Sequence, residues 1–253
     1  MKRALRISLW ILLFSGFFTL LSFTTASFKE KRCNEIFIHV NNVSGYPLIN
    51  ESYIENFLID NSYRVRGQLI TEIPVDEIES KVNDLSHVRT SKVYSDLMGD
   101  LHIKIEQKQP IARVFNPNGS SFYMDDKGNR MDLSNLYSAR VLAITSEKGI
   151  DLLEMEEQSE LSQKEQLYRL VQKINNEPFW SSQIVQVHLN DLGEIELTPR
   201  VGNHKILLGK ATDLSSKFEK LWNFYQTMSE HRNWNAYKVL NVKYKDQIVC
   251  TKK

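Results

Sequence analysis

The side chains that most often perform chemistry in proteins are scattered through this sequence instead of being grouped. No two of the six histidines have the His-x-x-x-His spacing that places a pair of metal ligands on one face of a helix. The sequence also lacks a glycine-rich phosphate loop and a Gly-x-Ser-x-Gly nucleophile motif. We therefore expect a protein that is not an enzyme and that takes no metal, no cofactor and no small-molecule substrate.

The remaining candidates for chemistry have simpler structural explanations. Asp125 and Asp126 are adjacent carboxylates, but they lie in the sequence Asp-Asp-Lys-Gly-Asn, which is typical of a turn and lacks calcium-loop spacing. His102 alternates with apolar neighbours, which indicates a solvent-facing position on a strand. Cys33 and Cys250 make no disulfide framework, and we expect two free thiols, although an oxidising compartment would allow them to pair.

Composition narrows the class of protein. The chain of 253 residues has a net charge of +1 with 25% charged residues, so its electrostatics do not favour binding to nucleic acid. A hydrophobic content of 42% is ordinary for a globular protein. The roughly 225 residues beyond the N-terminal segment are enough for one large or two small domains.

The N-terminal segment has the composition of a membrane anchor. Lys2, Arg3 and Arg6 precede an uncharged apolar stretch over residues 7–25. As a helix this stretch would be roughly 28 Å long, close to the ~30 Å hydrocarbon core of a bilayer. We expect a cytoplasmic tail (residues 1–6), a transmembrane helix (7–27) and a linker (28–34).

A cleaved secretory signal peptide is the alternative, because Thr24-Thr25-Ala26 before Ser27 resembles a small-x-small cleavage site. The apolar stretch is longer than the ~7–15 residues usual in such peptides, which favours a retained anchor. Cations flank the stretch on both sides, so the positive-inside rule is nearly balanced. The large body after the stretch favours an N-in orientation, with the rest of the chain outside the cytoplasm.

Residues 35–108 predict a small unit in the order strand, helix, helix, strand, strand. The strands are marked by alternating apolar residues and the helices by apolar faces at i, i+3 and i+4 spacing. Asn50 is a suitable N-cap for the first helix, and Pro74 suits the first turn of the second. The expected strands cover residues 36–40, 88–97 and 101–105. The first expected helix is capped by Asn50 and runs to about Asp60, and the second starts after Pro74 and has Ile78, Val82 and Leu85 on its apolar face.

Residues 109–253 predict a larger, mainly antiparallel β domain with two helices, so the fold class of the whole chain is α+β. The first helix contains Leu170 and ends at Pro178. The second begins near Asp213, and its apolar face, including Trp222, is expected in the core. The expected strands cover residues 111–115, 121–124, 141–145, 184–189, 194–198, 205–208 and a closing strand 239–249, with an acidic loop over 151–160.

Motifs that follow one another along most of the chain resemble the FtsQ/DivIB family of bacterial cell division proteins. The order of elements over residues 35–108 is similar to that of the family's POTRA domain. Residues 101–112 are similar to the strand that joins this domain to the second one, and residues 122–128 to the hairpin that follows. Later segments similar to the family are residues 193–197, 206–210 and 239–244, with Lys217 at the position of a helical lysine.

The resemblance implies a noncatalytic scaffold of the bacterial divisome, located in the plasma (inner) membrane at the division septum. Such a protein links early and late division proteins and recruits the bitopic proteins FtsB and FtsL, and through them the septal peptidoglycan synthase complex. In the family the partner adds along the last strand of the second domain. Asn241 and Lys243 replace the usual Asp and Arg there, which leaves open whether these positions form an ion pair.

The closing strand is therefore the candidate partner-binding site. A partner strand can extend its expected backbone edge by β-augmentation. Tyr244 combines an aromatic ring with a hydroxyl and is the expected anchor, while an ordinary strand tyrosine packed on the sheet is the alternative. The candidate residues are Lys243, Tyr244, Lys245, Asp246, Gln247, Ile248 and Val249.

A second function is compatible with the same module. A membrane-anchored protein of the POTRA type can instead assist in envelope protein assembly or translocation. Such proteins usually carry several POTRA units, whereas this sequence predicts one. An envelope enzyme such as a wall hydrolase would need a clustered nucleophile or metal site, for which the sequence contains no pattern.

Overall fold

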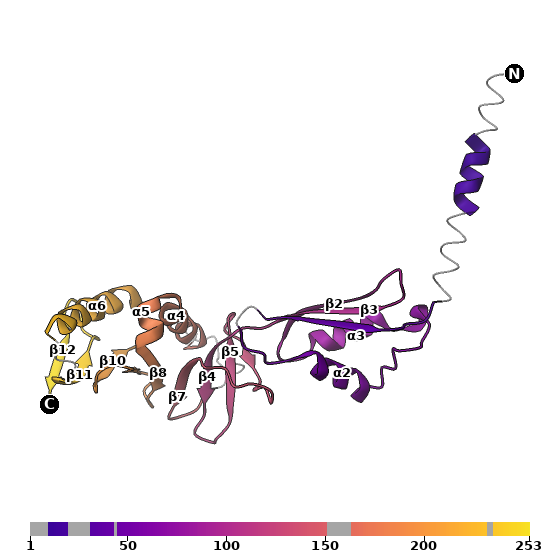
Figure 1. The fold of residues 1–253 in the computed structure, drawn as a ribbon. Coiled ribbons are helices and arrows are strands. Elements are labelled where there is room, and N and C mark those ends of the chain that lie inside the picture. Colours follow the sequence, from indigo (N-terminus) through magenta and orange to yellow (C-terminus); the bar gives the residue numbers. More distant parts are fainter. Residues whose placement is uncertain (1–9, 20–30, 43–44, 151–162, 232–234) are drawn as a thin grey trace. The chain divides into compact units, whose positions relative to one another are not determined.

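The computed structural model describes residues 10–19, 31–42, 45–150, 163–231 and 235–253. The chain divides into two compact units (Figure 1). Unit 1 comprises Met1–Val43 and Ile49–Gln107, and unit 2 comprises Ser44–Leu48 and Lys108–Lys253. Each unit combines helices with a β-sheet, which confirms the α+β fold class.

The N-terminal segment is described over residues 10–19, which are helical. The other parts of the expected transmembrane helix, residues 7–9 and 20–27, lie outside the described residues. The expected tail over residues 1–6 and the linker residues 28–30 lie outside them as well. In the described ranges, no helix has both the length and the apolar character needed to cross a membrane.

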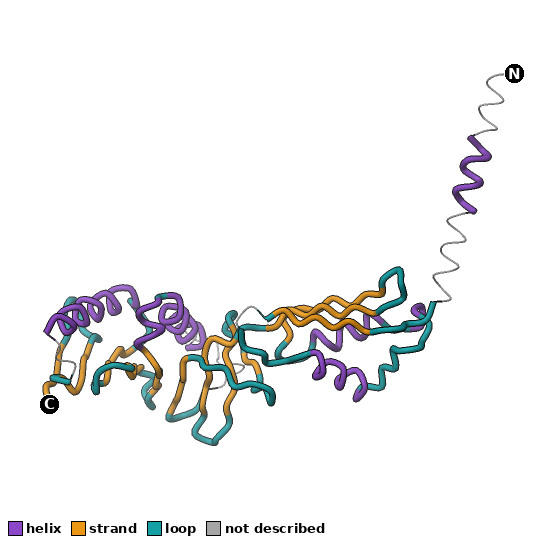
Figure 2. Tube along the Cα trace, viewed as in Figure 1, coloured by secondary structure: helices purple, strands orange, loops and turns teal. Residues whose placement is uncertain are grey.

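Unit 1 packs two α-helices against one face of a three-stranded sheet (Figure 2). Its elements are β1 (Ile36–Asn41), α2 (Glu51–Asp60), η1 (Ile70–Glu72), α3 (Val75–Asn83), β2 (Val88–Ser95) and β3 (Leu101–Gln107). The strand order is β1-β3-β2, with β1 parallel and β2 antiparallel to β3. Ile54, Ile78 and Ile103 are fully buried between the helices and the sheet, because their elements turn their apolar faces inward.

The helix starts of unit 1 follow local signals in the sequence. Asn50 is the N-cap of α2, and its Oδ1 accepts a hydrogen bond from the backbone N–H of Tyr53 at 2.9 Å. α3 starts at Val75, directly after Pro74 as predicted, and Pro74 is its N-cap residue instead of a residue of the first turn. Both predicted helices and all three predicted strands of this unit are present, and only the short η1 was not predicted.

Unit 2 is built on one nine-stranded mixed sheet. Its strands are β4 (Pro110–Phe115), β5 (Ser121–Asp125), β6 (Arg130–Met131), β7 (Leu142–Ser146), β8 (Ile184–Leu189), β9 (Ile195–Pro199), β10 (Lys205–Gly209), β11 (Tyr237–Asn241) and β12 (Val249–Lys252). The order is β12-β11-β10-β9-β8-β7-β4-β5-β6. The pairs β4–β7, β7–β8 and β10–β11 are parallel, and the other pairs are antiparallel.

Helices in unit 2 lie in two of the three connections between parallel strands, those of the pairs β7–β8 and β10–β11. They are α4 (Gln163–Asn176), α5 (Pro178–Gln183) and α6 (Leu214–His231). α4 and α5 lie between β7 and β8 in the chain, and α6 lies between β10 and β11. Leu170, Trp180 and Phe218 pack from these helices into the same core as the buried strand residues. The expected acidic loop over residues 151–160 lies outside the described residues.

Three expectations about unit 2 are wrong. The described residues of unit 2 contain three helices instead of two: α4 ends at Asn176, before Pro178 as expected, and Pro178 then begins α5, where its fixed φ and missing N–H suit the first position. Trp222 is 40% exposed, because it lies at the margin of the α6 face whose centre includes the buried Tyr225. The predicted closing strand is two strands, β11 and β12, separated by residues 242–248.

Candidate partner-binding edge of unit 2

A short hairpin of β11 and β12 forms one end of the sheet in unit 2. β11 is parallel to β10 and antiparallel to β12, with Leu240 opposite Cys250 and Asn241 opposite Val249. β12 is the last strand in the sheet order, so no strand among the described residues pairs with its outer edge. An open edge of this kind carries backbone N–H and C=O groups that another strand can bind.

The predicted site residues lie at the turn of this hairpin, beside the open edge. Tyr244 is 51% exposed, and Ile248 is partly buried against the core. Asp246 has a φ of +59°, a left-handed conformation that Asp adopts more readily than most residues with a side chain. Of the other predicted residues, Lys243, Lys245 and Gln247 are exposed in the turn, and Val249 is the first residue of β12.

Helix α6 holds this turn in place. Lys220 Nζ donates hydrogen bonds to the carbonyl oxygen of Val242 at 3.1 Å and to that of Tyr244 at 2.5 Å. Both carbonyls lie beyond the end of β11, where backbone acceptors need partners other than the strand ladder. A charged donor from the neighbouring helix supplies that partner, and such bonds are stronger than those between neutral groups.

Both the backbone N–H and the side-chain amine of Lys243 have partners. Its backbone N–H donates to Asn241 Oδ1 at 3.0 Å, and its Nζ lies 3.1 Å from Glu194 Oε1. Its methylene groups lie over Gly209, where a Cβ would come within 2.7 Å of Lys243 Cδ. Asn241 and Lys243 are thus joined by a side chain–backbone hydrogen bond, and the ion-pair partner of Lys243 is Glu194.

Further polar groups secure α6 to the sheet. Lys217 is buried and donates from Nζ to the carbonyl oxygen of Lys210 at 2.7 Å. Burial lowers the pKa of Lys217, while the nearby carboxylate of Asp213 opposes this shift. Tyr225 Oη lies 2.8 Å from His204 Nε2, and burial raises the pKa of Tyr225 to about 12. These groups bind to other parts of unit 2 and so stabilise the helix that carries Lys220.

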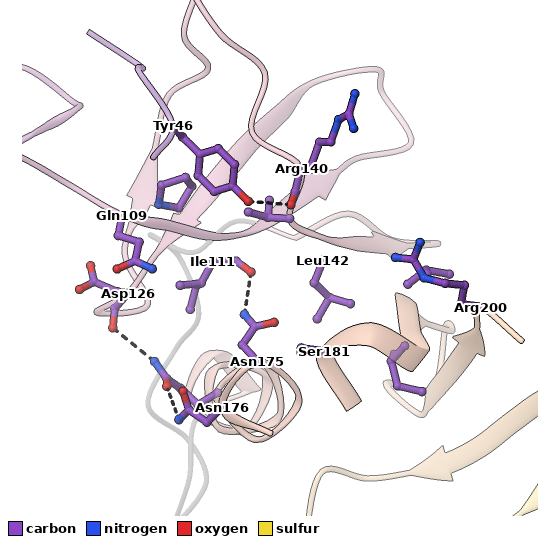
Figure 3. A pocket seen from close by; sticks show the side chains of 15 residues that line it. Tyr46, Gln109, Ile111, Asp126, Arg140, Leu142, Asn175, Asn176, Ser181 and Arg200 are labelled. Atoms are coloured by element: carbon purple, nitrogen blue, oxygen red, sulfur yellow. Dashed lines mark hydrogen bonds between the residues drawn. The ribbon is translucent and has the colours of Figure 1, made fainter. Parts of the chain in front are cut away.

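A polar cleft of about 530 Å³ lies in another part of unit 2 (Figure 3). Several of its polar side chains bind the protein's own backbone: Asn175 Nδ2 donates to the carbonyl oxygen of Ile111 at 2.9 Å, and Gln172 Nε2 to that of Asp126 at 3.4 Å. The residues that line the cleft include no histidine and no cysteine. The cleft therefore lacks the usual nucleophile–base pairs, and its hydrogen bonds hold α4 against β4 and the turn after β5.

The residues considered for chemistry in the sequence have structural roles. Asp125 is buried, and its Oδ1 accepts hydrogen bonds from the backbone N–H groups of Lys127 at 3.0 Å and Asn129 at 2.7 Å, as in the predicted turn. Cys33 and Cys250 are free thiols. Within the described parts of the chain, no group of three or more His, Cys, Asp or Glu side chains is arranged to hold a metal ion.

His102 has more contacts than a solvent-facing strand residue would need. Its Nε2 lies 2.9 Å from Asp96 Oδ2, and its ring stacks against both Phe37 and Tyr94 with centroid separations of 5.2 Å. These rings come from the three strands of unit 1 and form a row across the sheet. His102 therefore stabilises the sheet.

Sequence reasoning missed three of the four residues of β12, the strand with the open edge. Cys250, Thr251 and Lys252 of β12 follow the predicted site in the chain. The polar residues 245–247 between two apolar segments, with Asn241 before them, were the available signal for a hairpin. The role of Lys220 has no such signal, because it depends on contact with a segment distant in sequence.

Comparison with known families agrees with the two-unit architecture. A family model described as a POTRA-like domain matches residues 31–106, and one described as FtsQ/DivIB, C-terminal related, matches residues 109–251. Neither match indicates an enzyme family, and no curated protein matches the chain. The second match covers more than half of the 253 residues, and the chain therefore belongs to the FtsQ/DivIB family.

Proposed function

We propose that this protein is a noncatalytic scaffold of the bacterial divisome that recruits FtsB-like and FtsL-like proteins, and through them the septal peptidoglycan synthase complex. Membership in the FtsQ/DivIB family and the POTRA-like match support a role as a division-protein scaffold. The observation that carries the proposal is the open edge of β12 beside an exposed turn, because it offers a protein partner a backbone template.

The proposed binding mode is β-augmentation along β12. A partner strand would extend the sheet through backbone hydrogen bonds, which supply affinity, while side chains on the strand supply specificity. Val249 and Thr251 are two residues apart and so share one face of β12, and both are exposed. Tyr244 is the proposed anchor, and Lys243, Lys245, Asp246, Gln247 and Ile248 are the proposed surrounding contacts.

The proposed setting is the plasma (inner) membrane at the division septum. A tail over residues 1–6 would lie in the cytoplasm and residues 7–27 would cross the membrane once, supported by the long uncharged stretch after three cations. The linker (28–34), the POTRA domain (35–108) and the C-terminal β domain (109–253) would then lie outside the cytoplasm.

Calorimetric binding of the full chain in nanodiscs to the extracytoplasmic segment of the organism's FtsB-like protein tests the proposal. We expect Tyr244→Ala and Thr251→Pro each to weaken binding at least tenfold, about 1.4 kcal/mol. Tyr244→Ala removes the anchor, and proline at position 251 breaks the pairing of β12 with β11 and so disturbs the strand that carries the open edge. Tyr53→Ala is the matched control, since Tyr53 is an exposed tyrosine of α2 in unit 1 and should bind like wild type.

Each result has a separate meaning. Wild-type affinity in both variants would keep the scaffold function but rule out the β11–β12 hairpin as its site. No binding by the wild-type chain, even with the FtsL-like protein present, would contradict the recruiting role and favour envelope protein assembly. Depletion in cells then separates the two functions, because loss of the scaffold gives filaments without septa.

A further inference from the structure

The turn between β2 and β3 exposes two large apolar side chains at its tip. Leu97 is 80% exposed and Met98 is 73% exposed, the highest values among the large apolar side chains described in unit 1. Exposure of this extent leaves most of both side chains in contact with water, which costs free energy unless another apolar phase covers them.

The tip is held in one conformation by its own residues. Asp96 Oδ1 accepts hydrogen bonds from the backbone N–H groups of Met98, Gly99 and Asp100 at 2.9, 3.0 and 3.0 Å. Asp96 Oδ2 lies 2.9 Å from His102 Nε2. The turn therefore presents Leu97 and Met98 with little conformational freedom left to lose on binding.

The first described residues of the linker contact this tip. Lys31 Nζ donates to the carbonyl oxygen of Leu97 at 2.5 Å, and the backbone oxygen of Lys31 accepts from Ile70 N at 3.0 Å. The carbonyl oxygen of Arg32 lies 3.1 Å from the position that a Cβ of Gly99 would take. The apolar tip and the point where the chain enters unit 1 are thus side by side.

This entry point has to lie near the bilayer if residues 7–27 cross it. Only residues 28–30 separate the end of the proposed span from Lys31, and they can extend at most about 14 Å. The linker residues 28–34 include three cations, Lys29, Lys31 and Arg32, and one acid. Apolar side chains next to cations are the combination that favours binding to the interface of an anionic bilayer.

We propose that the β2–β3 turn docks on the outer surface of the bilayer, with Leu97 and Met98 entering the interfacial region and Lys31 and Arg32 contacting anionic lipid headgroups. The proposal rests on the single membrane span proposed above. Docking would set the distance and tilt of unit 1 relative to the membrane.

A spin label at position 98 tests the docking. The full chain with Cys250→Ser and Met98→Cys is labelled in nanodiscs that contain phosphatidylglycerol, and its collisions with oxygen and with a water-soluble nickel complex are compared. The full chain with only Cys250→Ser is the control for labelling of Cys33. Cys33 should take up little label, because it is buried and burial raises the pKa of its thiol. We expect an oxygen-to-nickel collision ratio at position 98 typical of lipid.

The matched control is a label at position 192. Leu192 is 83% exposed at the β8–β9 turn, where Asn190 Oδ1 accepts from the backbone N–H groups of Leu192 and Glu194, so it is an apolar tip of similar construction. We expect a several-fold lower collision ratio at position 192 than at position 98. Adding Leu97→Ser should lower the ratio at position 98, because half of the apolar tip is lost.

An aqueous ratio at position 98, equal to that at position 192, would overturn the docking proposal. A carbonate wash of vesicles that contain the full chain separates this result from a failure of the anchor. Chain that resists the wash while position 98 is aqueous contradicts docking alone, whereas chain that washes off contradicts the membrane span and the docking together.

Discussion

The β2–β3 turn of unit 1 and the β11–β12 turn of unit 2 both join neighbouring antiparallel strands, but different parts of the chain hold them. In the first, the carboxylate of Asp96 accepts hydrogen bonds from three backbone N–H groups of its own turn. In the second, Lys220 of α6 binds two backbone carbonyls, and Lys243 lies between Gly209 and Glu194. One turn is held locally, and the other is held by elements distant in sequence.

This difference predicts how each region responds to substitution. The locally held turn needs only its own residues and β3, so changes elsewhere in the chain should leave it intact. The turn of residues 242–248 needs α6 and β10 in place. Substitutions in α6 or β10 should therefore loosen the β12 edge even where the substituted residue does not contact a partner. The three predictions below test this contrast in order of expected effect.

Gly209→Ala should have the largest effect. Gly209 has a φ of +71°, and the left-handed conformation costs a residue with a Cβ about 1–2 kcal/mol. The new Cβ would also meet Lys243 Cδ at 2.7 Å and displace that side chain. We expect the free energy of unfolding of unit 2 to fall by about 2 kcal/mol in urea. Tryptophan fluorescence follows it, because three of the four tryptophans lie in unit 2 and the fourth, Trp10, lies in the N-terminal segment.

Gly119→Ala is the control for backbone strain. Gly119 has a φ of +84°, but a Cβ there has no neighbour within 4 Å. The free energy of unfolding of Gly119→Ala should therefore fall only by the cost of a positive φ, because no side chain is displaced. Equal losses in the two variants, together with unchanged partner binding, would contradict the role of Gly209 in positioning Lys243.

Lys220→Met should have an intermediate effect. It removes the donor for the carbonyl oxygens of Val242 and Tyr244 but keeps an aliphatic side chain of similar length. Because water can reach the exposed part of the turn, we expect a loss of only about 1 kcal/mol in the free energy of unfolding. Faster amide hydrogen exchange at residues 243–248 should accompany this loss.

Lys173→Met is the comparison for Lys220→Met. Lys173 also projects from a helix of unit 2, but its Nζ pairs with Oε1 of Glu177, the residue between α4 and α5, and binds no turn carbonyl. We expect a change below about 0.5 kcal/mol, as for most partly exposed ion pairs, and no change in exchange at the β11–β12 turn. Similar exchange in both variants would show that α6 does not hold the turn.

Asp96→Asn should have the smallest effect, a loss of stability near neutral pH that disappears in acid. The hydrogen bond with His102, followed by the backbone N–H of Asp100, lowers the pKa of Asp96 from 3.8 to about 2. Because the folded-state pKa is lower than the unfolded one, Asp96 stabilises the fold above pH 3.8 and loses that contribution as the pH falls to about 2. Asparagine keeps the turn acceptor and does not titrate.

The measurement is the melting temperature of wild type and Asp96→Asn across that acid range. The wild-type value should fall more steeply, and His102→Gln should make the fall less steep because it removes the largest cause of the shift. Parallel curves for wild type and Asp96→Asn would show that the ionised carboxylate adds nothing to this turn. Lys220→Met should leave the difference between these curves unchanged, since it acts only on the other turn.

The elements of unit 1 were predictable because their signals are local. Asn50 caps α2 at the predicted residue, and the alternating apolar residues of β1 and β3 line the buried face. In unit 2 the same patterns predicted most strands and the helices α4 and α6. They did not predict α5, since Pro178 both follows one helix and begins the next, nor the two-residue β6.

The candidate site was predictable only in part. Resemblance to the FtsQ/DivIB family indicated the C-terminal end of the chain as a partner-binding region, but the expected continuous strand is a hairpin. The packing of Leu48 against Tyr123 and Met131 of unit 2 also had no sequence signal, because a single apolar residue between two elements does not indicate its partners.

The sequence by itself determined most of the helices and strands, the N-cap of α2, several turns, and the resemblance to the family. These depend on residues close together in the chain, whose periodicity and conformational preferences act locally. Only the tertiary structure decided which strand lies at the edge of the sheet and what holds the turn before it. Those outcomes depend on Glu194, Gly209 and Lys220, which meet residues 242–244 only when β9, β10 and α6 pack together.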